Sequence, residues 1–207
     1  MLDAVIGVPD RLVRQIAFLR ELDQLKTVLR RTSVGDRSRR ENSAEHSWHM
    51  TAMVLALAEH APAGVDLARV LAMIVVHDVV EIDAGDTFAF DTAGHLDKAD
   101  RECAAAARIF ALLPGDQAVA LRGLWEEFEG GATPDARMAN ALDRFAALLQ
   151  NTQNGDGGTW REHAISREAV LRRMAPIREG LPALWPYVLQ AIDDAAARGL
   201  LGSDAPR

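Results

Sequence analysis

Histidine and carboxylate side chains interrupt one of the most hydrophobic runs of this sequence. His77 and Asp78 follow the apolar segment 67–76, whose large side chains recur at three- and four-residue intervals behind Asp66, a candidate N-cap. An ionisable group in an apolar setting must be paired, neutralised or bound to a metal. The pair alone is as typical of a hydrogen-bonded core histidine as of a metal site, so partners elsewhere in the chain decide the interpretation.

Two other segments supply such partners. Asn42 is placed to cap a helix, Glu45 can complete a capping box, and His46 lies on the apolar face of that helix. A further helix begins at Thr133-Pro134, and Asp143 lies beside its apolar stripe. Three helices therefore direct ligand-type groups inward, and a shared divalent cation would offset the cost of burying them.

The predicted metal ligands are His46, His77, Asp78 and Asp143. A mixed set of imidazole and carboxylate ligands suits Mn, Co, Fe or Zn, with Mg possible, better than Ca. We therefore expect one divalent transition metal, with coordination positions left open for water and a substrate.

The same segments resemble the HD-domain metal-dependent phosphohydrolase superfamily. The matching stretches are 41–46, 77–81 followed by Gly85-Asp86, and 141–145, within a region of about residues 25–151. They are most similar to the small bacterial 5'-deoxynucleotidases and to the eukaryotic branch that includes HD domain-containing protein 2. The resemblance implies an all-α, compact helical bundle around a buried metal, and hydrolysis of the 5'-phosphate of (deoxy)nucleoside monophosphates by a metal-activated water.

The resemblance also implies that Glu81 and Asp86 take part in catalysis. Our hypothesis is that Glu81 orients or deprotonates the water, while Asp86 protonates the leaving oxygen. The reaction would be the hydrolysis of a small phosphate ester, most naturally a nucleotide.

An arginine-rich stretch, residues 30–40, leads into His46. Guanidinium groups match phosphate oxygens well, and the resemblance aligns Arg30 and Arg39 with phosphate-binding arginines, with Arg31 as the alternative to Arg30. The tryptophan that follows the first arginine in the related enzymes is missing. That tryptophan could form a wall that excludes the 2'-hydroxyl of ribose. Discrimination against ribose should therefore be weaker here than in the related enzymes, unless Trp48 or Trp160 forms the wall instead.

Composition restricts the remaining possibilities. The 207-residue chain has a net charge of −7 and no linker-like segment, which predicts one domain over residues 1–201 and a flexible tail at 202–207. The acidic balance argues against a nucleic-acid-binding surface. The single Cys103 excludes an intramolecular disulfide. We expect a cytoplasmic protein without a membrane span, and a homodimer in which the terminal helices expose a second apolar face.

The periodicity predicts only helices and no sheet. The expected helices cover residues 9–31, 42 to about 62, 66–85, 98–113, 116–128, 133–151, 166–178 and 181–199. We expect His49 to be a core residue, or a residue that contacts the metal ligands, rather than a ligand itself. We expect Trp160, outside these helices, to anchor a loop on the core.

Two other functions compete with the nucleotidase. Hydrolysis of an alarmone or another nucleotide pyrophosphate would suit the His-Asp-x-x-Glu pattern, but Ile82 occupies the position where those enzymes carry a second acidic residue. A metal-binding regulatory protein without turnover is the other alternative, and the intact Glu81 and Asp86 disfavour it.

Overall fold

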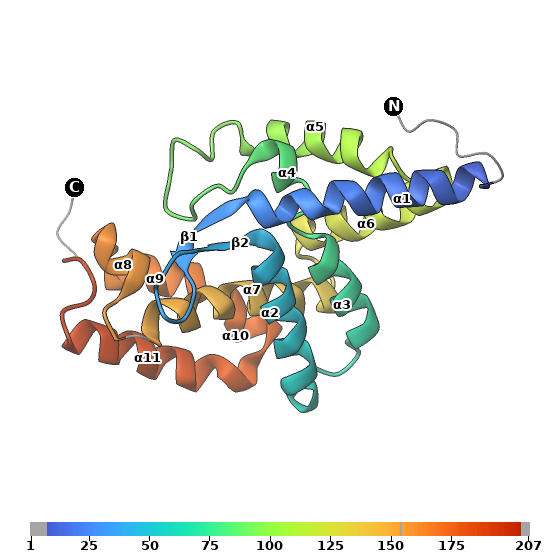
Figure 1. The fold of residues 1–207 in the computed structure, drawn as a ribbon. Helices are drawn as coiled ribbons and strands as arrows, with labels where there is room; N and C mark the ends of the chain where they lie inside the picture. Colours follow the sequence, from blue (N-terminus) through green and yellow to red (C-terminus); the bar gives the residue numbers. More distant parts are fainter. Residues whose placement is uncertain (1–7, 154, 204–207) are drawn as a thin grey trace.

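A computed structural model of the chain describes residues 8–153 and 155–203 and confirms the all-α class (Figure 1). The α-helices are α1 (Asp10–Leu22), α2 (Ser43–Ala56), α3 (Leu67–Val76), α4 (Glu81–Ala84), α5 (Lys98–Phe110), α6 (Gly115–Gly130), α7 (Pro134–Thr152), α8 (Gly158–Glu162), α9 (Arg167–Met174), α10 (Pro176–Gly180) and α11 (Trp185–Ala197). Three short 3₁₀ helices, η1 (Asp23–Thr27), η2 (Ala58–His60) and η3 (Pro182–Leu184), and two strands, β1 (Leu29–Ser33) and β2 (Arg40–Asn42), complete the described elements.

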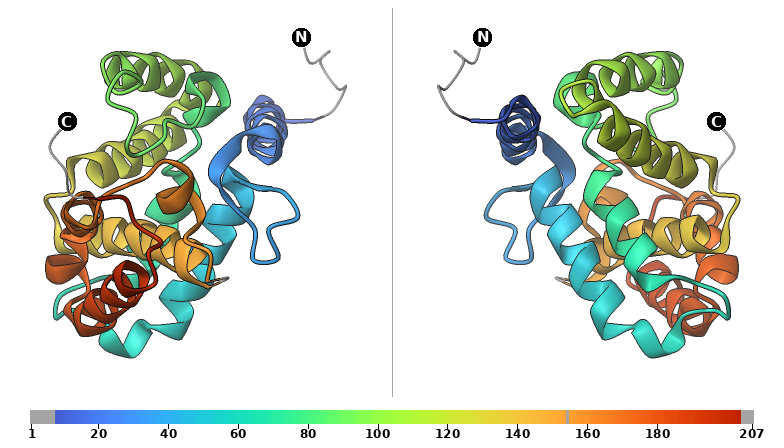
Figure 2. Two further views of the ribbon diagram at one scale, coloured as in Figure 1. Left: turned by 90° about the vertical axis from the view of Figure 1, so that its left-hand side faces the viewer. Right: turned by 90° about the vertical axis from the view of Figure 1, so that its right-hand side faces the viewer.

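Helix α7 is the central element of the bundle, with α2, α3 and α6 packed on it from one part of the chain and α9, α10 and α11 from another (Figures 1 and 2). Thr133 caps it through a hydrogen bond from the Ala136 N–H, and Pro134 occupies its first turn, as predicted. Helix α10 approaches very closely, because a Cβ on Gly180 would lie 2.1 Å from the Arg137 carbonyl oxygen. Any side chain there would push the two helices apart.

Two apolar clusters form the core, and α3 connects them. Val70, Met73 and Ile74 belong to the larger cluster, which is built around α7, whereas Val76 and Val79 belong to a smaller cluster with α1, α5 and α6. The polar residues that follow α3 therefore lie at the junction of the two clusters. This position gives them rigid, apolar surroundings.

Helix starts follow the local chemistry of the sequence. Asn42 caps α2, and its side chain and that of Glu45 form the predicted capping box. Asp66 caps α3 by accepting hydrogen bonds from the N–H groups of Ala68 and Arg69. Gly85, with φ of 74°, ends the segment as predicted, because a left-handed residue stops a helix at little cost only when it is glycine.

The predicted helix 9–31 is wrong beyond Leu22, and so is the prediction of no sheet. After α1 the chain forms η1 and then β1, which pairs antiparallel with β2. Thr27 and Val28 are β-branched, which disfavours continued helix, and the pairing of the two strands satisfies their backbone groups instead. Strands of five and three residues are too short for alternation to reveal them in the sequence.

Other predicted boundaries also differ, including those of α2, which ends at Ala56, and of α11, which begins at Trp185. Helix α3 ends at Val76, so His77 and Asp78 lie in tight turns between α3 and α4 rather than in a continuous helix. Pro176 divides the helix predicted at 166–178 into α9 and α10, because proline lacks the N–H that would continue the ladder. Gly202, predicted to lie in the flexible tail, pairs with Ser166 in a parallel bridge. The rest of that tail, 204–207, lies outside the described residues.

None of the described helices combines the length and apolar character needed to span a bilayer.

Candidate metal and phosphate site

His46, His77 and Asp143 meet in the interior, although they come from three different parts of the chain. Each offers a ligand atom, and these atoms lie within 4.8 Å of one another. His46 is on α2, His77 follows α3, and Asp143 is on α7, so three elements that pack through the larger core cluster fix the geometry. His46 Nε2 lies 3.0 Å from Asp143 Oδ1. The structure thus brings these three predicted ligands together, and their role as metal ligands stays a prediction.

The donor set fits a divalent cation. The Ile74 carbonyl can only accept, so His77 Nδ1 carries the proton and donates to it at 2.7 Å. The Nε2 lone pair then faces the cluster, and burial lowers the pKa of His77, which keeps the ring neutral. Among the described residues, His77 Nε2 has no hydrogen-bond partner, although it is buried. A bound metal ion would use this lone pair, which is otherwise left unpaired.

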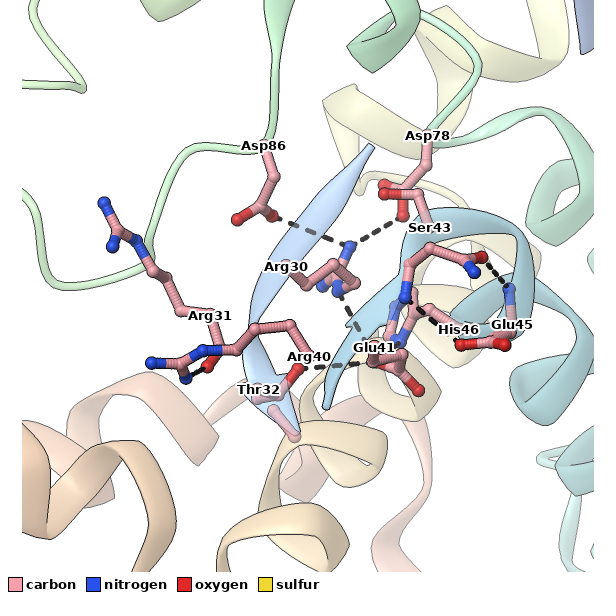
Figure 3. Close-up of polar contacts among 12 residues, drawn as sticks. Arg30, Arg31, Thr32, Arg40, Glu41, Ser43, Glu45, His46, Asp78 and Asp86 are labelled. Atoms are coloured by element: carbon pink, nitrogen blue, oxygen red, sulfur yellow. Dashed lines mark hydrogen bonds and ion pairs between the residues drawn. The ribbon is translucent and has the colours of Figure 1, made fainter. Parts of the chain in front are cut away.

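Arg30 occupies the centre of the acidic groups in this site (Figure 3). Its Nη1 donates to Asp78 Oδ2 at 2.8 Å and lies 3.8 Å from Asp86 Oδ1, and its Nε lies 3.8 Å from Glu41 Oε2. Burial opposes its charge, but the surrounding carboxylates outweigh burial and raise the pKa of the guanidinium. Arg30 is thus fully charged and held by carboxylates.

Asp78 adjoins the cluster on the side of Arg30. Its Oδ1 lies 3.1 Å from His77 Nε2 while its Oδ2 is held by Arg30. Burial raises the pKa of Asp78 to about 7. Asp143 differs, because the Arg144 guanidinium and the bond to His46 outweigh burial and hold its pKa well below its usual range. Asp143 therefore remains charged. Asp78 does not belong to the group of possible ligands, so its role as a fourth ligand stays a prediction.

Glu81 and Asp86, the predicted catalytic residues, both face this region. Ser43 Oγ donates to Glu81 Oε2 at 2.6 Å in a buried hydrogen bond, which fixes the carboxyl group. Burial raises the pKa of Glu81 to about 8 and also raises the pKa of Asp86. A carboxyl group with a pKa of about 8, such as that of Glu81, is suited to proton transfer.

Sequence reasoning missed the contributions of Ser43 and Glu41. Ser43 is the first residue of α2, and its hydroxyl reaches Glu81 across 38 positions of the sequence. Glu41 is 4% exposed and lies on β2, with its Oε2 3.7 Å from His46 Nδ1. Both precede His46 in the segment that carries the resemblance, but only pairing of β2 with β1 shows that Glu41 turns inward.

Three residues considered in the sequence analysis lie outside the cluster. Arg39 is exposed and its guanidinium pairs with Glu45, with Nη2 2.6 Å from Oε1. Arg31 follows Arg30 in the strand, so it points to the opposite side, as Figure 3 shows. His49 is half-buried and does not belong to the group of possible ligands. The structure thus brings Arg30, but not Arg39, to the site.

Two further arginines border the site from the other side. Arg144 pairs with Asp143, and Arg173, on α9, has its Nη2 3.9 Å from Asp143 Oδ2. Both line a cavity of about 160 Å³ together with Arg30, His77 and Glu81. Burial and the neighbouring Arg144 lower the pKa of Arg173 to about 10, so its guanidinium remains charged at neutral pH.

An open groove of about 630 Å³ lies beside the cavity and is lined by Arg31, Phe88, Phe90 and His163. A smaller cavity shares Phe88 and Phe90 with this groove and Arg30 and Arg173 with the inner cavity, so it lies between the two. The ring centroids of Phe88 and His163 are 4.6 Å apart. Trp160 is 1% exposed and packs in the larger core cluster, as predicted for a loop anchor.

Solved structures share the fold of this chain. A crystal structure described as a predicted metal-dependent phosphohydrolase from Magnetospirillum magnetotacticum MS-1 is 47% identical, with a TM-score of 0.89, over 94% of this chain and 100% of that one. A conserved hypothetical protein from Pyrococcus furiosus is similar in fold alone, with 18% identity and a TM-score of 0.58 over 88% of this chain and 99% of that one.

Relatives with a named activity are more distant. The 5'-deoxynucleotidase HDDC2 of Homo sapiens is 30% identical over 142 residues, covering 68% of this chain and 68% of that protein. Its Danio rerio counterpart is 27% identical over 158 residues, covering 74% of this chain and 78% of that protein. The family model of the HD domain matches residues 22–185. The chain therefore belongs to the HD domain family and is a metal-dependent phosphohydrolase.

Proposed function

We propose that this enzyme hydrolyses the 5'-phosphate of nucleoside and deoxynucleoside monophosphates at the cluster of His46, His77 and Asp143. The observation that carries the proposal is the convergence of these ligand atoms within 4.8 Å, beside an inner cavity bordered by three arginines. The named activity of the HDDC2 relatives supports the choice of substrate.

The residues of the chain divide the work of hydrolysis. A bound divalent cation lowers the pKa of water and offsets negative charge that develops on the phosphoryl group. Glu81, held by Ser43, accepts the proton of the attacking water, whose oxygen bonds to phosphorus as the bond to the 5'-oxygen breaks. Asp86 delivers a proton to that leaving oxygen, which releases the nucleoside and inorganic phosphate. Burial raises the pKa of Asp86, which favours the protonated form that this step requires.

The neighbouring groove supports a substrate with a bulky leaving group. Its volume, about 630 Å³, is ample for a nucleoside, and Phe88, Phe90 and His163 offer aromatic surface on which a base can stack. Trp48 is 69% exposed and does not line the groove or either of the two inner cavities, so it provides no wall against a 2'-hydroxyl. Trp160 lines the smaller of these cavities but is only 1% exposed, so it offers almost no surface to a substrate. We therefore expect ribonucleotides to be accepted as well.

A matched substrate panel tests this function. Specificity constants are measured with each candidate metal for deoxyribonucleoside and ribonucleoside 5'-monophosphates, and for nucleotide pyrophosphates such as alarmones. The proposal predicts turnover of both monophosphate series, with a deoxy preference below about tenfold, which corresponds to 1.4 kcal/mol. Exclusive hydrolysis of pyrophosphate compounds would replace the proposal with the pyrophosphohydrolase alternative.

The predicted homodimer stays part of the proposal. Helix α1 leaves Leu12, Ile16 and Leu19 exposed, at 45%, 36% and 64% of their surface, on the side away from the core. A second copy of the chain would bury such a stripe. Light scattering after size exclusion should give twice the chain mass, and Leu19→Asp should shift it toward the monomer.

A further inference from the structure

We propose that Arg173, with Arg144 beside it, forms the anion-binding side of the site and binds the phosphoryl oxygens of the substrate. The inference rests on the proposed phosphate-ester substrate, and it assigns this role to an arginine of α9 in place of Arg39.

The first argument is that carboxylates surround the guanidinium of Arg30 closely, whereas that of Arg173 has only one distant carboxylate contact. Arg30 donates to Asp78 and lies within 4.0 Å of the carboxylates of Glu41, Glu81, Asp86 and Asp143. Within the described part of the chain, the guanidinium of Arg173 donates no hydrogen bond, and its one ion-pair contact is at 3.9 Å. A guanidinium group has five N–H donors, and when they are free in a cavity wall they can donate to the oxygens of an oxyanion.

The second argument is position. Arg173 lines both the inner cavity of about 160 Å³ and the smaller one that leads to the aromatic groove. It therefore stands where the phosphate of a substrate would lie if the leaving group extended along the groove. Arg144 lines the same inner cavity, and its buried Nε has no partner among the described residues.

The third argument is charge. The carboxylates of Glu41, Asp78, Glu81, Asp86 and Asp143 outnumber the guanidinium groups of Arg30, Arg144 and Arg173 by two. A divalent cation would offset that formal excess of negative charge. Arg173 would then be the cation that the carboxylates leave free to attract a phosphate dianion.

Binding of inorganic phosphate to the metal-loaded protein tests the inference without any turnover. Calorimetry should show that Arg173→Ala weakens phosphate binding by roughly 10- to 150-fold, the loss expected for a charge-assisted hydrogen bond. The phosphate affinity of Arg173→Lys should lie between those of the wild type and Arg173→Ala, because an ammonium group keeps the charge but lacks the planar arrangement of donors. Arg172→Ala is the matched control: Arg172 is the neighbouring residue, but it is exposed and pairs with Glu168. It should bind phosphate like the wild type.

The metal content and melting temperature of each variant separate direct binding from a structural role. Arg173→Ala should keep its metal, since removing a positive group beside Asp143 does not weaken a cation site. With a phosphate monoester as substrate, KM should rise more than kcat falls. Phosphate affinity within about twofold of wild type in Arg173→Ala would overturn the inference. So would loss of metal in that variant, or a metal-loaded wild type that binds no phosphate. If phosphate binds as expected but no nucleoside monophosphate is turned over, the proposed function fails and the inference stands.

Discussion

The two sides of the buried site are held in place by different kinds of structure. His46, His77 and Asp143 come from α2, the end of α3 and α7, which pack through the larger apolar cluster. Arg30 comes instead from a five-residue strand, and Arg173 from an eight-residue helix followed by Pro176. Metal ligands need fixed positions, whereas groups that receive a substrate can tolerate adjustment. We call His46, His77 and Asp143 the ligand side of the site, and Arg30 and Arg173 the arginine side. We infer that the ligand side determines whether the enzyme is active and that the arginine side determines how tightly it binds its substrate.

The largest effect should follow from breaking the ligand side. His77→Ala removes a neutral imidazole whose Nε2 faces the cluster. Loss of a residue that only hydrogen-bonds to a metal ligand costs about 10–100-fold in metal affinity, so loss of a ligand itself should cost more than about 100-fold. Metal analysis of the purified protein should find about one ion per chain in the wild type and almost none in this variant. His49→Ala, on the same helix as His46 but outside the cluster, is the control and should retain its metal.

Glu81→Gln should separate catalysis from metal binding. The substitution keeps the shape of a side chain that is 7% exposed, but removes the group that accepts a proton. We expect full metal content and a kcat lower by about 10²- to 10⁴-fold. Glu102→Gln, which alters a carboxylate that lines the same cavity and pairs with Lys98, should have a much smaller effect. Equal losses in the two variants would contradict the role of Glu81.

Ser43→Ala should produce a smaller and pH-dependent change. The Ser43 hydroxyl stabilises the charged form of Glu81 and so lowers its pKa, and removing it should raise that pKa further. Because Glu81 must be deprotonated to act as a base, the acidic limb of the pH profile should move to higher pH. We expect a loss of roughly 10- to 150-fold in kcat at neutral pH, in line with one hydrogen bond to a charged group. An unchanged pH profile would show that Ser43 does not influence Glu81.

The smallest effect should come from Arg39. Its exposed ion pair with Glu45 is screened by solvent and contributes little to stability. Since the structure does not bring it to the cluster, we expect Arg39→Ala to change KM for phosphate esters by less than about twofold. Arg30→Ala is the comparison, and it should lower stability and activity together, because it leaves buried carboxylates without their cation. A large rise in KM for Arg39→Ala alone would restore the prediction made from the sequence.

Helical periodicity explains why the ligand side could be predicted from the sequence. His46 and Asp143 lie on regular, capped helices whose apolar stripes indicate the buried face, and Gly85 marks the end of the segment that follows His77. The exact course of residues 77–80 could not be predicted, because it depends on tertiary packing that replaces the last helical turns with tight turns.

The arginine side lacked comparable signals. Arg30 faces inward only because two short strands pair, and their length leaves no recognisable alternation. Arg172 and Arg173 are adjacent and chemically identical, so the sequence does not distinguish the exposed residue from the one that lines the cavity. The break at Pro176 and the close packing of α10 on α7 decide the direction in which α9 presents them.

Removal and return of the metal test the central claim most directly. The wild-type protein is stripped with a chelator, and hydrolysis of a deoxynucleoside 5'-monophosphate is followed as Mn, Co, Fe or Zn is added back and bound metal is counted. Our account predicts no activity in the stripped protein and a rise in kcat that ends when about one ion per chain is bound. His77→Ala should recover nothing at the same metal concentrations. Undiminished hydrolysis by the metal-free protein, or full recovery by His77→Ala, would contradict the account.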